Sequence, residues 1–308
     1  MQLFYTPDHA RVGDVIPYYE NGEFKLFYLK NWNPYFGSDK TYGWHLLTTK
    51  DLIHYESETA IGILGGTGCI IKVEGLYHLY YCVFEDQPQR QYVCHATSTD
   101  LTNWTKYPDE TFGPDESIYL LTDWRDPHVI WNEEEKCWWM ILCAQNQGNT
   151  KRRGCVGLCK SADLHHWTCC EPLYAPQSSM SAYECPDLFY MNGWWYLVFS
   201  QFTDRFQTLY RMSRSCNGPW IRPKTDSFDG RAFYAAKTCS DGEHRYIFGW
   251  NPTRTQNTWN FDPDPTHEGY DYKTYDWGGS LVQHEIYARE DGTLAVRSNP
   301  ALKKALTV

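Results

Sequence analysis

The chain has 308 residues and a formal net charge of −10, and Trp, Tyr and Phe together make up 17% of it. The acidic excess argues against nucleic acid or an anionic membrane as the partner and favours a neutral ligand. Aromatic residues at this density, with few runs of Ala, Leu, Glu and Lys, favour strands over helices. No stretch approaches the ~18 apolar residues of a membrane span, and the N-terminus lacks a basic leader with a long apolar region, so we expect a cytoplasmic protein.

Five aromatic segments follow one another along the chain, and each comes after a turn signal. Their central apolar positions are Leu26, Leu79, Met140, Leu197 and Tyr246, which lie 49 to 61 residues apart. The segments read "GEFKLFYL" (22–29), "GLYHLYYCVF" (75–84), "KCWWMILCA" (136–144), "GWWYLVFS" (193–200) and "GEHRYIFGW" (242–250). Regular recurrence of short strands at this period predicts a repeat architecture.

A second repeated pattern follows the first three aromatic segments. It reads "TTKDLIHYE" (48–56), "TSTDLTNWT" (97–105) and "KSADLHHWT" (160–168), with a looser "SRSCNGPW" (213–220) after the fourth. Each unit is therefore expected to be several short strands closed by an Asp-Leu-x-x-aromatic turn, at a period near that of a propeller blade. The sequence predicts an all-β fold, a five-bladed β-propeller forming a single domain over residues 1–308. A β-sandwich is the alternative, and 251–279 is expected to be a long polar loop in the last blade.

Three acidic residues fall at nearly the same place in different repeats. Asp14 lies 12 residues before Leu26, Asp126 lies 14 before Met140, and Glu184 lies 13 before Leu197. Each would begin the first strand of its blade, and the first strands of a propeller line its central channel. We therefore expect the three carboxylates to converge at the mouth of that channel, which is where propellers usually bind ligands.

Carboxylates gathered in this way repel one another, which raises the pKa of at least one of them and suits a general acid beside an ionised nucleophile. Paired carboxylates break glycosidic bonds through an oxocarbenium-like transition state, and Trp and Tyr provide platforms for sugar faces. Metal binding by the same acids is the alternative interpretation. It is disfavoured because no His falls in register with the three acids.

The twelve cysteines raise the question of disulfides or zinc, and the densest group is Cys155, Cys159, Cys169 and Cys170. In a strand, Cys155 and Cys159 share a face but lie about 13 Å apart, too far to bind one ion as a pair. We expect buried, reduced thiols in a reducing compartment. No metal or other cofactor is expected, because the histidines, His95 among them, show no metal-ligand spacing.

At the acidic positions the sequence resembles glycoside hydrolase family 32, the invertases, inulinases and levanases, and the related family 68. "WRDPHVIW" and "YECPDLF" are similar to the Arg-Asp-Pro and Glu-Cys-Pro-Asp motifs of these enzymes. The resemblance implies a five-bladed propeller and a retaining mechanism. Asp14 would be the nucleophile that forms a fructosyl-enzyme, and Glu184 would protonate the leaving group and then activate water. Asp126, with Arg125, would hold sugar hydroxyls and stabilise the transition state.

The likeness extends to the Asp-Leu-x-x-Trp turns and to "FYAAKTCSDG" (233–242), and the matching segments make Cys185 and Tyr234 candidate substrate-binding residues. Trp44 is a further candidate for stacking on substrate, with core packing as its alternative role. The family's nucleophile sits in a Trp-Met-Asn-Asp-Pro-Asn-Gly segment, whereas this chain has "HARVGDVIPYY" around Asp14. The usual C-terminal β-sandwich of the family is also not expected here, because the sequence stops soon after the fifth repeat.

The leading hypothesis is a retaining hydrolase of β-fructofuranosides that takes a small sugar or oligosaccharide as substrate. A furanosidase of the arabinan or xylan type is the second possibility, because five-bladed propellers of that kind also place three acids around the channel. The third is a carbohydrate-binding propeller without activity, which the altered segment around Asp14 allows. Retention of all three acids argues against it, because a simple binding site does not need mutually repelling carboxylates.

Overall fold

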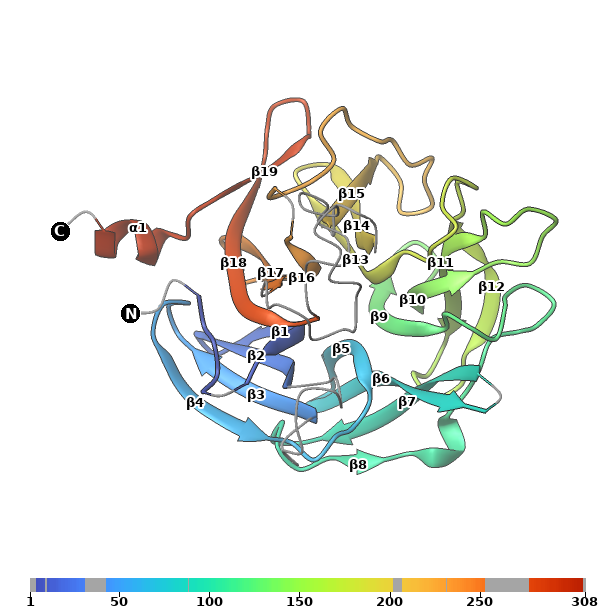
Figure 1. Ribbon diagram of the computed structural model, residues 1–308, viewed down its shortest axis with the longest axis horizontal. Coiled ribbons are helices and arrows are strands. Elements are labelled where there is room, and N and C mark those ends of the chain that lie inside the picture. Colours follow the sequence, from blue (N-terminus) through green and yellow to red (C-terminus); the bar gives the residue numbers. More distant parts are fainter. Residues whose placement is uncertain are drawn as a thin grey trace, which may run out of the picture. The chain divides into compact units, whose positions relative to one another are not determined.

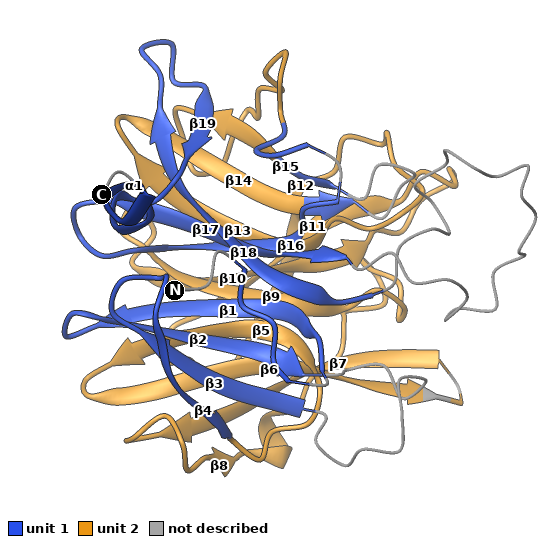
Figure 2. Cartoon of the chain, turned by 60° about the vertical axis from the view of Figure 1, so that its left-hand side comes forward, with its two compact units in different colours: residues 1–60, 200–209, 227–308 blue, residues 61–199, 210–226 orange. Residues whose placement is uncertain are grey.

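The computed structural model describes residues 4–8, 10–30, 43–87, 89–201, 207–230, 232–252 and 277–306. The chain divides into two compact units, coloured blue and orange in Figure 2. The first unit comprises Met1–Ala60, Ser200–Leu209 and Ser227–Val308, and the second comprises Ile61–Phe199 and Tyr210–Asp226. The expected polar loop at 251–279 falls mostly outside the described residues.

The first unit contains one antiparallel sheet, whose strands follow the order β16-β17-β18-β1-β2-β3-β4, with β19 paired to β18 (Figure 1). A short helix, α1 (Pro300–Leu306), follows β19. The strands are β1 (Val12–Glu20), β2 (Glu23–Lys30), β3 (Gly43–Thr49), β4 (Tyr55–Ala60), β16 (Tyr234–Ser240), β17 (Arg245–Pro252), β18 (Gly279–Ala288) and β19 (Leu294–Arg297).

The second unit contains two four-stranded antiparallel sheets, β5-β6-β7-β8 and β12-β11-β10-β9, and most of the three-stranded sheet β13-β14-β15. The adjoining ends of β14 and β15 belong to the first unit. The elements are β5 (Gly66–Val73), β6 (Leu76–Asp86), β7 (Gln89–Ser98), β8 (Thr105–Lys106), the 3₁₀ turn η2 (Pro108–Glu110), β9 (Arg125–Asn132), β10 (Cys137–Gln145), β11 (Gly154–Ser161), β12 (Thr168–Tyr174), β13 (Glu184–Met191), β14 (Trp194–Gln201) and β15 (Gln207–Ser213).

The aromatic segments occupy the predicted place in these sheets. They form β2, β6, β10, β14 and β17, each the second strand of an antiparallel run, and their central residues are at most 5% exposed. Burial on both faces explains their continuous apolar runs. The chain is therefore all-β and built of blade-like sheets. Val12 of β1 also pairs with Gly279 of β18, which joins two of the runs into one eight-stranded sheet.

The Asp-Leu pattern forms the same turn at each of its three occurrences. In the second unit, Oδ1 of Asp100 accepts the backbone N–H groups of Thr102 and Asn103, and the Ser98 hydroxyl accepts that of Leu101. Leu101 has a φ of 67° and is 3% exposed, so burial of its side chain offsets an unfavourable backbone conformation. The same bonds and positive φ recur at Asp51-Leu52 and Asp163-Leu164.

All twelve cysteines are free; nine are buried, whereas Cys137, Cys169 and Cys170 are partly exposed, which differs from the expected burial of the whole group. Cys155 and Cys159 lie on β11, and Cys169 and Cys170 lie on the neighbouring β12. The register pairs Cys159 with Cys169, and their sulfur atoms are 3.6 Å apart. Among the described residues, no helix is long and apolar enough to cross a membrane.

Candidate active site

In the second unit, strands β9 and β13 contact each other through their first two residues. Arg125 begins β9, and its Nη2 donates to Oε1 of Glu184, the first residue of β13, at 2.7 Å. One residue further along each strand, the backbone N–H of Cys185 donates to Oδ2 of Asp126 at 2.9 Å. The Arg-Asp pair of one strand thus interlocks with the Glu-Cys pair of the other, and the structure brings these four predicted site residues together.

The guanidinium of Arg125 has further partners in the same unit. Its Nη1 donates to Asp123 and to Oε1 of Gln91, the latter at 3.3 Å, and its Nε lies 3.9 Å from Oδ2 of Asp126. Burial opposes the charge of Arg125, but the surrounding anionic groups raise its pKa well above the ordinary value. Arg125 is therefore always protonated and anchors the carboxylates around it.

The thiol of Cys143 also lies close to this group. Burial raises the pKa of Cys143 well above its ordinary value, although the positive charge of Arg125 acts in the opposite direction. The thiol is consequently neutral at pH 7, and the negative charge around Arg125 comes from carboxylates alone. When Asp123, Asp126 and Glu184 are ionised, three negative charges surround one positive charge. Such a site favours a ligand, or a transition state, that develops positive charge.

The backbone at this junction is unusual, because Asp126 has a φ of 59° and Cys185 a φ of 48°. Asp tolerates the left-handed region, whereas Cys occurs there rarely. Strained residues persist where the surrounding structure over-determines them, and they gather at functional sites. Asp126 is 4% exposed and fixed by the Cys185 N–H, whereas the side chain of Glu184 is 22% exposed. Glu184 is thus the carboxylate that a substrate reaches more easily.

Asp14 lies in the first unit and is held by a different set of residues. It is the third residue of β1, inside a bulge, because Val12 pairs with Lys30 while Val15 pairs with Tyr28. Oδ1 of Asp14 accepts a hydrogen bond from the indole Nε1 of Trp250 on β17, at 3.0 Å. The bulge and the indole together fix the direction of this carboxylate.

Two further aromatic rings of the first unit lie beside the Trp250 indole. The ring of Trp250 lies 5.4 Å from that of Tyr234 in a T-shaped arrangement and 5.7 Å from that of Trp277. A Cβ placed on Gly13 would meet the Trp277 ring at 1.9 Å, so only glycine fits there. Trp250 is 0% exposed and Tyr234 is 4% exposed. These rings therefore form a packed support for Asp14.

The remaining predicted residues are placed as follows. Trp44, the second residue of β3, pairs with Leu29 and is 1% exposed. This burial favours core packing over stacking on substrate. Cys185 is 2% exposed and contacts Asp126 through its backbone. Asp14, Asp126 and Glu184 all lie within three residues of the start of their strands, as their similar offsets from the strand centres predict.

Sequence reasoning missed Asp123, Gln91 and Trp250, which position the predicted residues. Asp123 lies two positions before Arg125, the first residue of the Arg-Asp-Pro motif, and this closeness to the motif could have indicated it. Gln91 and Trp250 come from other strands, at 34 and 236 residues from their partners, and no local pattern marks them.

Antiparallel blade-like sheets with acids at the starts of their first strands are consistent with a propeller that binds its ligand among carboxylates. The sequence model of the "Glycosyl hydrolases family 32 N-terminal domain" matches residues 15–271 of the chain. The chain therefore belongs to glycosyl hydrolase family 32, in agreement with the resemblance noted in the sequence.

Individual relatives agree with this assignment. The chain is 24% identical, over 96% of its length, to the levanbiose-producing levanase of Bacillus subtilis (strain 168). It is 26% identical, over 82% of its length, to the sucrose-6-phosphate hydrolase of Escherichia coli. These matches cover 60% and 55% of the two relatives, so the chain spans little more than half of their length.

Among solved structures, the Bombyx mori GH32 beta-fructofuranosidase BmSUC1 aligns with a TM-score of 0.71 at 21% identity. The alignment covers 97% of this chain and 66% of that one. At this identity the likeness shows a shared fold.

Proposed function

We propose that the protein is a retaining glycoside hydrolase of β-fructofuranosides, built as a single five-bladed β-propeller over residues 1–308. The observation that supports this best is the interlocked group at the starts of β9 and β13, where Arg125 bridges toward Glu184 and Asp126 is fixed by a backbone N–H. In this group the Glu184 carboxylate is accessible, whereas the Asp126 carboxylate is held in place. Glycoside hydrolysis needs both kinds, one to move a proton and one to stabilise charge.

In the proposed mechanism, Asp14 attacks the anomeric carbon of the fructosyl unit and forms a covalent ester. Glu184 first protonates the departing oxygen and then removes a proton from the incoming water. The indole N–H of Trp250 orients the Asp14 carboxylate for attack, since it bonds to one oxygen of that group. A retaining reaction requires the carboxyl groups of the nucleophile and the acid/base about 5 to 5.5 Å apart in the working enzyme.

Asp126 and Arg125 have the supporting roles. The fixed negative charge of Asp126 stabilises the oxocarbenium-like transition state and accepts hydrogen bonds from sugar hydroxyls. Arg125 holds Glu184 at a defined position and offsets the repulsion among the neighbouring acids. Glu184 must take up a proton before it can act as the acid, and the carboxylate that remains after it protonates the leaving group pairs with Arg125 again.

The substrate class is sucrose or a fructo-oligosaccharide, in keeping with the levanase and sucrose-6-phosphate hydrolase among the relatives. The acidic chain suits neither nucleic acid nor an anionic membrane as a partner. Twelve free thiols fit the cytoplasm, where we place the protein.

The test is a screen of purified protein on sucrose, inulin, levan and aryl arabinofuranosides, following released monosaccharide. We expect release from one or more of the fructosides. Glu184→Gln should lower kcat by about 10²-fold or more while leaving the fold intact, because the amide cannot transfer the proton. Glu171→Gln, an exposed change on β12 of the same unit, is the control and should leave turnover unchanged.

Other outcomes of the same screen would contradict the proposal. Release from arabinofuranosides alone would favour the arabinan or xylan type of furanosidase. Binding of fructans without any release would favour the inactive carbohydrate-binding propeller. Normal turnover by Glu184→Gln would mean that another group is the acid.

A further inference from the structure

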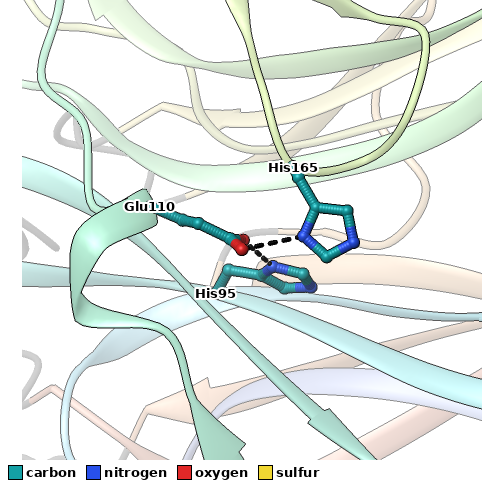
Figure 3. A group of neighbouring side chains, drawn as sticks. All are labelled: His95, Glu110 and His165. Atoms are coloured by element: carbon teal, nitrogen blue, oxygen red, sulfur yellow. Dashed lines mark hydrogen bonds and ion pairs between the residues drawn. The ribbon is translucent and has the colours of Figure 1, made fainter.

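A second cluster of ionisable side chains lies in the second unit, apart from the residues of the candidate active site. Figure 3 shows the carboxylate of Glu110 pointing toward the imidazoles of His95 and His165. Oε2 of Glu110 lies 2.6 Å from Nδ1 of His95, and Oε1 lies 2.8 Å from Nδ1 of His165. One nitrogen or oxygen atom from each residue can be chosen so that all three lie within 4.8 Å of one another.

We propose that His95, Glu110 and His165 bind a divalent transition-metal cation, with zinc as the ordinary occupant. Two imidazoles and one carboxylate are a common donor set for zinc, at about 2.0 to 2.2 Å from the metal. Donor atoms around such an ion lie roughly 3.3 Å apart, so movements of an ångström or so would bring these three into place. Three protein ligands leave a fourth position for water.

The backbone around each candidate ligand is anchored before any ion arrives. His95 lies on β7, and its carbonyl oxygen accepts the N–H of Tyr107, which directly precedes the η2 turn that ends with Glu110. His165 follows Leu164 in the Asp-Leu turn, where its N–H donates to Oδ1 of Asp163 at 2.9 Å. A site held in this way loses little conformational entropy on binding a metal.

The ring of His95 is oriented by its neighbours as metal-binding imidazoles usually are. Its Nε2 lies 3.0 Å from Nδ1 of His78, so the nitrogen that does not face the metal has a hydrogen-bond partner. The ring also stacks on Tyr80 at 4.6 Å and on Tyr107 at 5.2 Å. These contacts direct Nδ1 of His95 toward Glu110, and Nδ1 is the nitrogen that would bind the proposed metal.

The cluster also joins two sheets of the second unit. His95 and Glu110 belong to the part of the chain that contains β7 and η2, whereas His165 belongs to the turn between β11 and β12. His95 is 3% exposed, but the side chain of His165 is 37% exposed, so an ion in solution can reach the group. A bound metal would therefore cross-link the two sheets and stabilise the unit.

The proposal departs from the expectation drawn from sequence, where His95 had no metal-ligand spacing. The three residues are separated by 15 and 55 positions, and only the fold brings them together. The site is independent of the proposed hydrolase activity, since it uses none of the residues placed in the reaction.

The experiment is calorimetric titration of ZnCl₂ into EDTA-treated, desalted protein at neutral pH, with thermal unfolding measured on the same samples. We expect one zinc per chain and a rise in Tm on binding. His165→Ala and Glu110→Gln should each weaken binding at least about 10-fold and abolish the rise in Tm. Circular dichroism without metal checks that both variants fold. If His165→Ala does not fold, the isosteric Glu110→Gln variant alone provides the test.

The matched control is His166→Ala, because His166 is the next residue of the same turn but pairs with Asp163, at 2.8 Å. It should bind zinc like the unchanged protein. The proposal is wrong if the unchanged protein and the Glu110→Gln variant bind zinc equally, since the three residues would then form a hydrogen-bonded network alone. Zinc binding that is lost in Cys169→Ser but kept in Glu110→Gln would place the ion on thiols and would equally overturn the proposal.

Discussion

Arg125 shares its guanidinium among Glu184, Asp123 and Gln91, and this sharing decides how the acids of the second unit are arranged. Without it, the carboxylates of Asp123, Asp126 and Glu184 would repel one another with no positive charge between them. Breaking an ion pair from one side costs more than the pair itself contributes, because the partner charge remains in a poorly solvated place.

Arg125→Ala should therefore lower the free energy of unfolding by about 3 kcal/mol, the low end for buried pairs because Glu184 is partly exposed. Urea unfolding measures this, and fructoside turnover should fall in the same variant. Arg152→Ala, an exposed change in the same unit, is the control. A stability equal to that of the unchanged protein would show that the acids do not depend on Arg125.

Trp250, in the first unit, allows a test of how Asp14, the proposed nucleophile, is oriented. Trp250→Phe keeps an aromatic ring beside Tyr234 but removes the N–H that donates to Asp14. We expect kcat on a fructoside to fall by about 10²-fold, comparable to the loss of one oriented donor in other enzymes. Trp131→Phe, at an exposed position, should have no such effect. An unchanged kcat in Trp250→Phe would mean that Asp14 needs no orienting donor.

At this scale, the sequence predicted that Asp14, Asp126 and Glu184 converge, because they lie 12 to 14 residues before the buried strand centres, and the family resemblance added Arg125. Within the second unit, the structure places Asp126 and Arg125 beside Glu184 and Cys185. The sequence did not predict Trp250 or Gln91, since a partner on a distant strand leaves no periodic signal. The same limit hid the cluster of His95, Glu110 and His165.

Among the elements, the Asp-Leu turns are where sequence and structure agree most closely. The Asp-Leu-x-x-aromatic pattern predicted a turn, and three copies form it with the same hydrogen bonds, including one from the Leu N–H to a hydroxyl two residues before the Asp. The positive φ of each Leu was not predictable from propensity, because Leu rarely adopts it. Burial in the core overrides that preference.

These turns also predict a dependence of stability on pH. Backbone and side-chain donors of Asn103, together with the Thr102 N–H, hold the pKa of Asp100 below its ordinary value. A carboxyl whose pKa is lowered by folding contributes stability above its unfolded pKa of about 3.9, and this contribution is lost as the pH falls through the folded pKa. Asp100→Asn keeps the acceptor oxygen but has no charge to titrate.

We therefore expect the Tm of Asp100→Asn to fall less steeply than that of the unchanged protein as the pH decreases below about 5. Calorimetric scans over this range give the two slopes, with Asp109→Asn as an exposed control in the same unit. Parallel slopes for Asp100→Asn and the unchanged protein would show that the turn does not depend on the ionised carboxylate.

For the whole chain, an aromatic repeat of 49 to 61 residues was enough to predict an all-β fold with each aromatic segment second in its run. It was not enough to predict that β18 and β1 pair at Gly279 and Val12, because a pairing at a single residue pair has no sequence signature. Membership of glycosyl hydrolase family 32 follows from the match over residues 15–271.

The central claim is a double displacement in which Asp14 forms the fructosyl-enzyme and Glu184 is the acid/base. The most direct measurement is the anomeric configuration of the methyl fructofuranoside formed first when the protein acts on sucrose or levan in the presence of methanol, read by NMR. A retaining mechanism predicts the β-anomer, because two inversions restore the configuration of the substrate. The α-anomer would show a single displacement and would contradict the account.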